Sequence, residues 1–234
     1  DRKELFITAN VREGEIYTLT DIKLTGELVV NEDVLRRLIS AKPGETYSRG
    51  KLERASEAMT RVLSNIGYAF AEVTPVPTVD REKREVAVTF FVNPGKRAYV
   101  RRINFIGNQR TQDEVLRREM RQLEGAWFSQ AAIDRSKGRL QRLGYFKEVT
   151  VETPKVPGSD DQVDVNFTVE EQSAGSFQFG VGYSELQGII TSVSLTQRNF
   201  LGTGNTVGTT IQNNDYVKRF DFSFFDPYFT DDGL

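Results

Sequence analysis

Residues 173–184 read SAGSFQFGVGYS, and the alternation within this stretch decides how the rest of the chain is interpreted. Successive side chains of a β-strand point to opposite faces, so every second residue here shares a face. One face is aromatic and apolar, and consists of Phe177, Phe179, Val181 and Tyr183. The other is small and polar, and consists of Gln178, Gly180, Gly182 and Ser184. We therefore expect the passage from water into a membrane to begin here.

The alternation continues to the end of the chain in four strand-like segments. They run over residues 175–185, 188–198, 205–214 and 217–226. Each is close to the roughly ten residues that a tilted strand needs to cross a bilayer. An aromatic face opposite a polar one favours transmembrane β-strands, and a soluble β-sandwich is the alternative. Since the smallest barrels have about eight strands, we expect either further strands beyond Leu234 or a substitute partner for the open sheet.

The composition argues against several classes of protein. The 31 basic and 33 acidic residues nearly balance, which argues against the clustered positive charge of a nucleic-acid groove. Cysteine and histidine are both absent, so thiolate nucleophiles, imidazole bases and the commonest zinc ligands are missing. We expect no enzyme activity, no catalytic residue, no cofactor and no metal. The start DRKELFITANV lacks a signal-peptide pattern, so we expect an internal piece of a longer protein.

An internal repeat organises the part of the chain before residue 173. LTDIKLTGELVVNEDVLRRLISAKPG at 19–44 matches VRRINFIGNQRTQDEVLRREMRQLEG at 100–125, with a constant offset of 81 residues. Later matches, such as Val86 with Val163, have an offset of 77, because the second copy is shorter within its long helix. We expect four regions: the last strand of a preceding module at 1–14, complete modules at 15–95 and 96–172, and barrel strands at 173–234.

Each complete module is expected to contain one strand, two helices and two closing strands. In the first module the strands cover residues 17–25, 71–79 and 84–93. In the second they cover residues 98–106, 146–153 and 161–170. This β-α-α-β-β order predicts an α+β fold with a small sheet and both helices on one face.

The helix ends carry their own signals. Thr111 and Glu114 are expected to form a capping box at the start of the short helix of the second module. Leu116, Met120 and Leu123 then lie on one buried face. The equivalent helix of the first module is expected to bury Val34, Leu35, Leu38 and Ile39. The long helices begin after serines and end at glycines that are placed for a left-handed residue.

Five segments, taken together and in order, resemble the BamA family, the outer-membrane β-barrel assembly factors of Gram-negative bacteria. They are VLRREMRQLEGAW at 115–127, LGYFKEV at 143–149, VPGSDDQVDV at 156–165, GSFQFGVGY at 175–183 and NFLGTG at 199–204. The resemblance covers nearly the whole chain. It implies that the modules are POTRA domains, the fourth and fifth of their protein, followed by the first antiparallel strands of a transmembrane β-barrel.

The resemblance also implies a function. A family member folds and inserts β-barrel proteins into the outer membrane without being an enzyme. The implied partners are outer-membrane lipoproteins with BamD first among them, unfolded outer-membrane proteins, periplasmic chaperones and the lipid bilayer, with no nucleic acid. The implied location is the Gram-negative outer membrane, with residues 1–172 in the periplasm. Pores for two-partner secretion or autotransporter assembly, and a soluble periplasmic scaffold, are the alternatives.

The first candidate site is a partner-binding surface around Glu124. In the family the matching glutamate contacts BamD, so the resemblance implies this role for Glu124, with Arg117, Arg118 and Trp127 beside it. The alternative is a solvated helix face whose ordinary ion pairs contribute about 0.2 to 0.5 kcal/mol each.

The second candidate site is an edge strand that accepts an extended substrate by β-augmentation. Its residues are Lys147, Glu148, Val149, Thr150 and Val151. The equivalent strand of the first module carries Pro75 and Pro77, which remove amide donors from an edge. We therefore expect the second module to be the better acceptor, unless neighbouring structure covers its edge.

The third candidate site is a lateral gate at the first barrel strand. It comprises Phe177, Gln178, Phe179, Gly180, Val181 and Gly182. Its two glycines lower strand propensity and packing, so the seam with the closing strand of the barrel should be weak. The glycine-rich NFLGTGN segment lacks the lysine of a phosphate loop and is predicted to be a turn.

Overall fold

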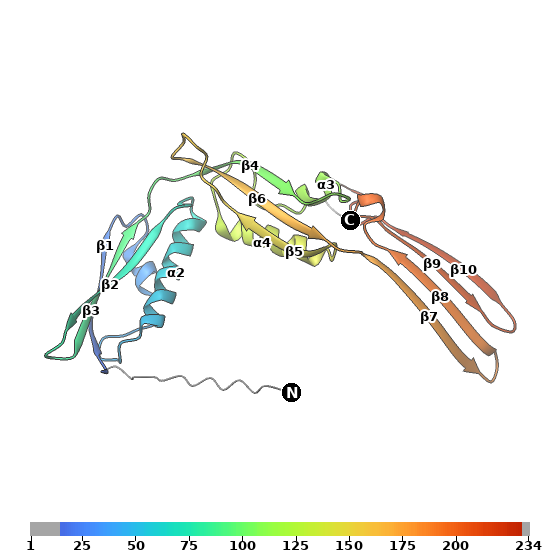
Figure 1. Cartoon of the computed structure of the whole chain (residues 1–234), viewed down its shortest axis with the longest axis horizontal. Helices are drawn as coiled ribbons and strands as arrows, with labels where there is room; N and C mark the ends of the chain where they lie inside the picture. The colour runs from blue at the N-terminus through green and yellow to red at the C-terminus, as the bar shows by residue number, and fades with distance from the viewer. Residues whose placement is uncertain (1–14, 231–234) are drawn as a thin grey trace, which may run out of the picture. The chain divides into compact units, whose positions relative to one another are not determined.

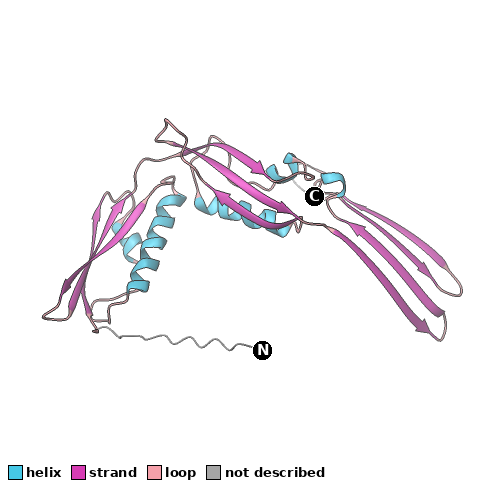
Figure 2. Cartoon of the chain, viewed as in Figure 1, coloured by secondary structure: helices cyan, strands magenta, loops and turns pink. Residues whose placement is uncertain are grey.

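The computed structural model describes residues 15–230, and the chain forms two compact units. The first unit contains the first module, and the second contains the second module together with the C-terminal strands. Figure 1 labels the helices and strands, and Figure 2 separates helix from strand by colour. The strand expected at residues 1–14 lies outside the described residues.

The first module has the predicted order of elements. They are β1 (Thr18–Gly26), α1 (Glu32–Arg36), α2 (Arg49–Asn65), β2 (Glu72–Asp80) and β3 (Glu85–Asn93). The sheet order is β1-β3-β2, with β1 parallel and β2 antiparallel to the central strand β3. In Figure 1, α2 lies across one face of this sheet. The last strand in sequence is therefore the middle strand in space.

The second module repeats this arrangement. Its elements are β4 (Tyr99–Ile106), α3 (Asp113–Arg117), α4 (Gln130–Arg142), β5 (Phe146–Glu152) and β6 (Gln162–Glu171). The sheet order is β4-β6-β5, again with a parallel pair on one side and an antiparallel pair on the other. The predicted strand and helix order of both modules is thus confirmed.

The core of each module lies between the central strand and the long helix. Alternate residues of the central strands are buried: Val86, Val88, Phe90 and Val92 in β3, and Val163, Val165, Phe167 and Val169 in β6. The long helices bury Leu52, Ala55, Met59 and Leu63 in α2, and Ala132, Ile133 and Leu140 in α4. Each fully buried Val, Leu, Ile, Phe or Met side chain contributes about 1.5 to 3 kcal/mol, so packing between these two layers stabilises each module.

The predicted capping box is wrong. The N-cap of α3 is Gln112, which makes no side-chain cap hydrogen bond, and Thr111 lies one residue earlier. Thr111 is buried, and its hydroxyl accepts a hydrogen bond from the Asn199 side chain instead. The hydroxyl that the local pattern assigned to the helix therefore accepts its hydrogen bond from a residue 88 positions away.

The short helices also bury less than predicted, because each has only five residues. Leu35 is fully buried, but Val34 is 44% exposed. Leu116 and Met120 are buried, whereas Leu123 lies in the loop after α3 and is 66% exposed. The helical period used for the prediction does not extend through these loops.

Gly26 and Gly107 end the first strand of each module in a conformation that requires glycine. Their φ angles are +107° and +94°. A Cβ atom would lie 2.1 Å from the Val92 carbonyl oxygen at Gly26, and 2.2 Å from the Val169 oxygen at Gly107. Both the left-handed backbone and the close approach of the central strand exclude other residues.

The C-terminal region forms a separate antiparallel sheet. It contains β7 (Gly175–Ser184), β8 (Gly188–Gln197), β9 (Thr206–Asn213) and β10 (Lys218–Phe225), in the order β10-β9-β8-β7. The turn between β8 and β9 includes the short 3-10 helix η1 (Phe200–Gly202), so the predicted turn at NFLGTGN is confirmed. Figure 1 shows these four strands as two long hairpins side by side.

The register places most aromatic side chains of this sheet on one face, and Phe225 lies on the other. Phe177 pairs with Leu195, Leu195 with Thr209, and Thr209 with Phe222. Their face is exposed: Phe177 is 67% and Phe222 is 73% accessible. The opposite face carries mainly glycine, serine, threonine and glutamine, together with Ile190, Arg219 and Asp221. Within residues 15–230, no helix has both the length and the apolar character needed to cross a membrane.

Candidate functional site

Glu124 is fixed against the outer edge of β4. Its Oε1 atom accepts a hydrogen bond from the Ile103 backbone N–H at 2.7 Å and lies 3.4 Å from Arg117 Nη1. Arg117 in turn donates through Nε to Asp113 Oδ2 at 2.5 Å. Both contacts of Glu124 end on Oε1, and the side chain is 43% exposed, so Oε2 is open to a positively charged partner.

An aromatic stack lies on the same edge, where the loop after α3 runs along β4. Trp127 stacks on Tyr99 with ring centroids 3.8 Å apart and an interplanar angle of 19°. The Arg97 guanidinium lies 4.1 Å from the centre of the Trp127 ring on which it stacks. We call Tyr99, Arg117, Leu123, Glu124 and Trp127 the Glu124 surface. Exposed aromatic, aliphatic and arginine side chains around a carboxylate are typical of protein-binding surfaces.

Arg118 does not belong to this surface, although it follows Arg117 directly. Its guanidinium lies 4.0 Å from the centre of the ring of Tyr228, which follows β10 in the sequence. Its Nε and Nη2 atoms are buried and have no hydrogen-bond partner in the part of the chain that the structure describes. The prediction that Arg118 lies beside Glu124 is therefore wrong, because successive residues of a helical turn point in different directions and Arg118 points to Tyr228.

The predicted edge strand is an edge in the structure. β5 pairs with β6 alone in the three-stranded sheet. Val149 is buried in the core, while Lys147 donates to Glu170 on β6 at 2.9 Å. This hydrogen bond raises the pKa of Lys147. The beginning of the strand is partly occupied, because the Gln172 side chain donates to the carbonyl oxygens of Gly144 and Phe146.

β7, the predicted gate strand, is the outermost strand of the four-stranded sheet. It pairs with β8 along its whole length, from Gly175 with Gln197 to Ser184 with Gly188. A Cβ atom at Gly180 would lie 2.7 Å from Ser192 Oγ, whereas one at Gly182 would meet nothing within 4 Å. The polar face at Gly180 is therefore closely packed, and Gly182 leaves it open.

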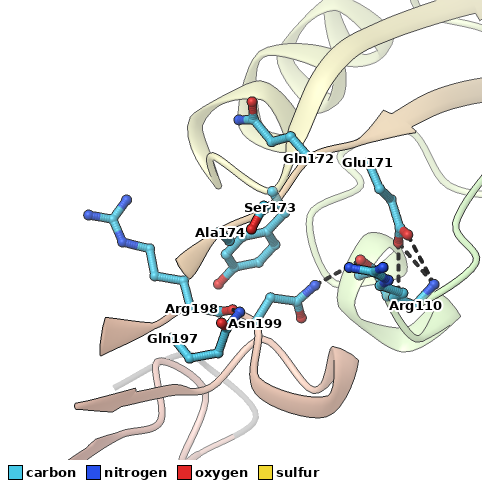
Figure 3. A pocket seen from close by; sticks show the side chains of 10 residues that line it. Arg110, Glu171, Gln172, Ser173, Ala174, Gln197, Arg198 and Asn199 are labelled. Atoms are coloured by element: carbon cyan, nitrogen blue, oxygen red, sulfur yellow. Dashed lines mark hydrogen bonds between the residues drawn. The ribbon is translucent and has the colours of Figure 1, made fainter. Parts of the chain in front are cut away.

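A small polar cavity of about 100 Å³ lies where the second module meets the strands (Figure 3). Glu171 spans it from β6 and accepts hydrogen bonds from the backbone N–H groups of Arg110 and Thr111, at 3.0 and 2.7 Å. Burial acts to raise the pKa of the Glu171 carboxyl, but the Thr111 side chain and these two N–H groups outweigh it and hold the pKa below its ordinary value. The carboxylate therefore stays ionised and fastens the loop before α3 to β6.

Sequence reasoning missed the residues at this junction. Glu171 reaches Thr111 across 60 positions, and Asn199 reaches it across 88. No local period connects such residues. One signal was available: with the N-cap at Gln112, Thr111 has no role in the helix, so a polar residue there indicates a partner elsewhere in the chain.

The sequence matches the POTRA family, described as surface antigen variable number repeat, over residues 17–95 and 98–172. These matches cover more than half of the 234 residues, so the chain belongs to the POTRA family.

Relatives named outer membrane protein assembly factor BamA align with almost all of the chain. The protein of Buchnera aphidicola subsp. Acyrthosiphon pisum is 35% identical over 229 residues, covering 98% of this chain and 37% of the relative. The protein of Neisseria meningitidis serogroup B is 32% identical over 235 residues, covering 100% of this chain and 30% of the relative. The chain thus spans less than half the length of these relatives.

Two solved structures are similar in fold as well as sequence. BamA from Haemophilus ducreyi lacking POTRA domains 1–3 matches with a TM-score of 0.80 and 37% identity, over 93% of this chain and 41% of that one. POTRA3-5 of Haemophilus influenzae BamA matches with a TM-score of 0.63 and 34% identity, over 66% of this chain and 61% of that one.

Proposed function

We propose that this chain is the part of an outer-membrane β-barrel assembly factor in which two POTRA modules continue into the first strands of a transmembrane barrel. The observation that carries the proposal is the exposed aromatic face of β7–β10, in a chain that aligns almost end to end with assembly factors. Each strand has 8 to 10 residues, close to the length that crosses a bilayer at a tilt. Residues 1–172 would then lie in the periplasm of a Gram-negative cell.

Reconstitution tests this function. The full-length protein in liposomes, with its lipoprotein partners, should speed the folding of a urea-unfolded β-barrel protein, followed by its heat-modifiable mobility on gels. Phe177→Lys with Phe179→Lys on the aromatic face is the inactivating control, because a charged side chain facing lipid costs about 2 to 4 kcal/mol. Folding no faster than with empty liposomes would refute the proposal. Export of a soluble polypeptide instead would support a secretion pore.

The Glu124 surface is proposed to bind an outer-membrane lipoprotein of the assembly complex, of the BamD type. The support is the ordered carboxylate with a free Oε2 atom beside the exposed Leu123 and Trp127. Charge complementarity would let an arginine or lysine of the partner pair with Glu124, and the aromatic stack would supply the apolar area.

Two substitutions separate binding from local structure at this surface. Glu124→Gln keeps an acceptor for the Ile103 N–H but removes the charge, and Glu124→Lys reverses the charge. Affinity for the lipoprotein, measured by titration, should fall in the order wild type, Glu124→Gln, Glu124→Lys. Glu114→Lys on the exposed side of α3 is the matched control. Equal affinities for wild type and Glu124→Lys would sink the assignment.

The β5 edge is proposed to accept an extended segment of an unfolded outer-membrane protein, delivered by periplasmic chaperones. β5 has no proline, whereas its counterpart β2 has Pro75 and Pro77. Amide hydrogen exchange with an added barrel-strand peptide tests this ranking. Protection should increase along residues 147–151, and an increase confined to β2 would refute it.

β7 is proposed to form the lateral gate with the closing strand of the barrel. The support is its outermost position and Gly182, which leaves part of its polar face unpacked. A cysteine at Gln178, paired with one on the closing strand of the full-length protein, tests the gate. Substrate folding should stop when the pair is cross-linked and resume on reduction. Folding that continues through the cross-link would exclude a gate here.

A further inference from the structure

The second module contacts the four-stranded sheet at two places, the β8–β9 turn and the segment after β10 that contains Tyr228. The backbone N–H of Gln112 donates to the Gly202 carbonyl at 3.0 Å, and the Tyr145 hydroxyl donates to the Gly204 carbonyl at 2.9 Å. Asn199 links both sides, because its side-chain nitrogen donates to Thr111 Oγ1 at 2.8 Å and its side-chain oxygen accepts from the Gly204 N–H.

The β8–β9 turn is strained and closely packed on the module. Asn199 and Leu201 have φ angles of +51° and +52°, a region that L residues rarely occupy. A Cβ atom at Gly202 would lie 1.9 Å from the Arg110 carbonyl oxygen, and one at Gly204 would lie 2.1 Å from Arg118 Nη2. Such strain persists only where surrounding contacts hold it, so the module itself shapes this turn.

The second contact is made by Tyr228, in the segment that follows β10. Its hydroxyl donates to Glu119 Oε1 at 2.7 Å and accepts from Arg139 Nη2 at 3.2 Å. Arg139 Nε donates to Glu119 Oε2 at 2.7 Å, which closes a triangle of three side chains. Glu119 is only 4% exposed. Burial and the neighbouring Glu119 raise the pKa of Tyr228, so its hydroxyl remains a proton donor.

Arg118 connects the two contacts. It lies against Gly204 on one side and faces the Tyr228 ring on the other. Its buried Nε and Nη2 atoms make no hydrogen bond within residues 15–230, although a buried guanidinium without an acceptor is unfavourable. The face of an aromatic ring attracts a cation, so the Tyr228 ring takes the place of the missing acceptor. Removing Tyr228 would leave the Arg118 guanidinium, which lies beside Gly204, without the ring that faces it.

We infer that Tyr228 is a latch that fixes the four-stranded sheet on the second module, and that Arg118 couples this latch to the β8–β9 turn. With the latch open, the sheet would remain joined to the module by residues 172–174 and by a weakened β8–β9 contact. The inference rests on the contacts themselves and is independent of the proposed assembly function.

Spin-label distances in the full chain in detergent micelles test the latch. The chain has no cysteine, so Arg135→Cys on α4 and Tyr216→Cys in the β9–β10 turn provide two unique labels. We expect one narrow distance in the wild-type background and loss of that single distance in Tyr228→Ala. Tyr228→Phe keeps the ring over Arg118 but lacks the hydroxyl, so it should broaden the distribution less. Phe229→Ala, at a neighbouring aromatic that is 82% exposed, is the matched control.

Amide exchange tests the coupling through Arg118. In Tyr228→Ala, protection of the Gln112 amide should fall, although Gln112 does not touch Tyr228, because its acceptor lies in the β8–β9 turn. Far-UV circular dichroism must show that the variant is folded. An unchanged distance distribution in folded Tyr228→Ala, or equal broadening in Phe229→Ala, would overturn the latch. Unchanged Gln112 protection beside a broadened distance would overturn the coupling.

Discussion

The two modules have the same order of elements and the same sheet topology, but they carry different side chains at matching positions. The first strand of each is joined to the loop before the long helix by one isolated bridge, Thr18 with Thr46 and Tyr99 with Trp127. Both residues of the second bridge stand 81 positions after those of the first. Two small threonines in one module are thus replaced by a stacked aromatic pair in the other.

The same comparison applies to the charged residues. Glu124 and Glu119 stand 81 positions after Pro43 and Leu38, neither of which can accept a side-chain hydrogen bond. One of these glutamates lies on the Glu124 surface, and the other holds Tyr228. The fold of the repeat therefore fixes the position of a side chain. The type of residue at that position decides whether the module also contacts a partner or the four-stranded sheet.

The largest test of this comparison concerns the two cores. Phe90 and Phe167 occupy equivalent, fully buried positions, and each substitution to alanine should cost about 3 to 5 kcal/mol of unfolding free energy. Trp127 is the only tryptophan of the chain, so its fluorescence reports on the second module. Phe167→Ala should shift that transition in denaturant, and Phe90→Ala should leave it in place. Equal shifts would mean that the modules unfold as one.

The glycines that end the first strands should behave alike in both modules. Gly26→Ala and Gly107→Ala place a Cβ atom against a backbone oxygen in left-handed conformation, which should cost about 3 kcal/mol. Gly44→Ala and Gly125→Ala are the controls, because they share the positive φ but meet no atom within 4 Å. Hydrogen exchange of β3 and β6 measures each effect in its own module. If a control substitution destabilises its module as much as its partner does, the positive φ alone accounts for the loss of stability.

Glu119→Leu makes the second module resemble the first at this position. The substitution removes the acceptor of both Arg139 and Tyr228, and should cost about 2 kcal/mol, since hydrogen bonds to charged groups contribute about 1.5 to 3 kcal/mol. Denaturant unfolding followed by Trp127 fluorescence checks the value. Leu38→Met in the first module, a change of similar volume, should leave this transition unmoved. A stability gain in Glu119→Leu would contradict the role of the buried carboxylate.

The smallest expected effect is the pH dependence that the Arg101–Asp164 pair gives to the second module. Arg101 contacts Asp164 through two hydrogen bonds, of 2.9 and 2.5 Å, whereas the equivalent residues of the first module are Thr20 and Ala87. The Arg101 guanidinium lowers the pKa of Asp164 below its ordinary value of 3.8. A carboxyl with a lower pKa in the folded state stabilises above the unfolded pKa and loses this contribution as the pH falls.

Arg101→Ala should therefore destabilise the second module near neutral pH and have little effect well below pH 3.8, the ordinary pKa. Trp127 fluorescence at the two pH values gives the difference. Thr20→Ala in the first module is the control and should show no such dependence. An equal loss at both pH values would assign the effect of Arg101 to packing rather than to charge.

The sequence pattern predicts the elements better than the contacts between them. Periods of two and 3.6 locate the strands and long helices, because burial of one face is a local property. Leu123 breaks this rule, since a loop has no period. Thr111 breaks it for another reason: its hydroxyl can accept a hydrogen bond either from a helix N–H or from another side chain, and only the folded chain brings the Asn199 side-chain nitrogen close enough to compete. The Tyr228 triangle has no local signal at all.

The position of β3 and β6 at the centre of their sheets has a consequence for the order of folding. Thr20 hydrogen-bonds to Val86 across 66 positions, and Asn104 to Asn166 across 62, so neither sheet can close before its last strand is present. Long-range pairing of this kind is slow, because the chain loses the entropy of closing the loop before any stabilising contact forms. β6 ends at Glu171 and β7 begins at Gly175. A chain that emerges N-terminus first therefore completes the second module just before β7 emerges. The first strand of the four-stranded sheet can then form next to a module that is already folded.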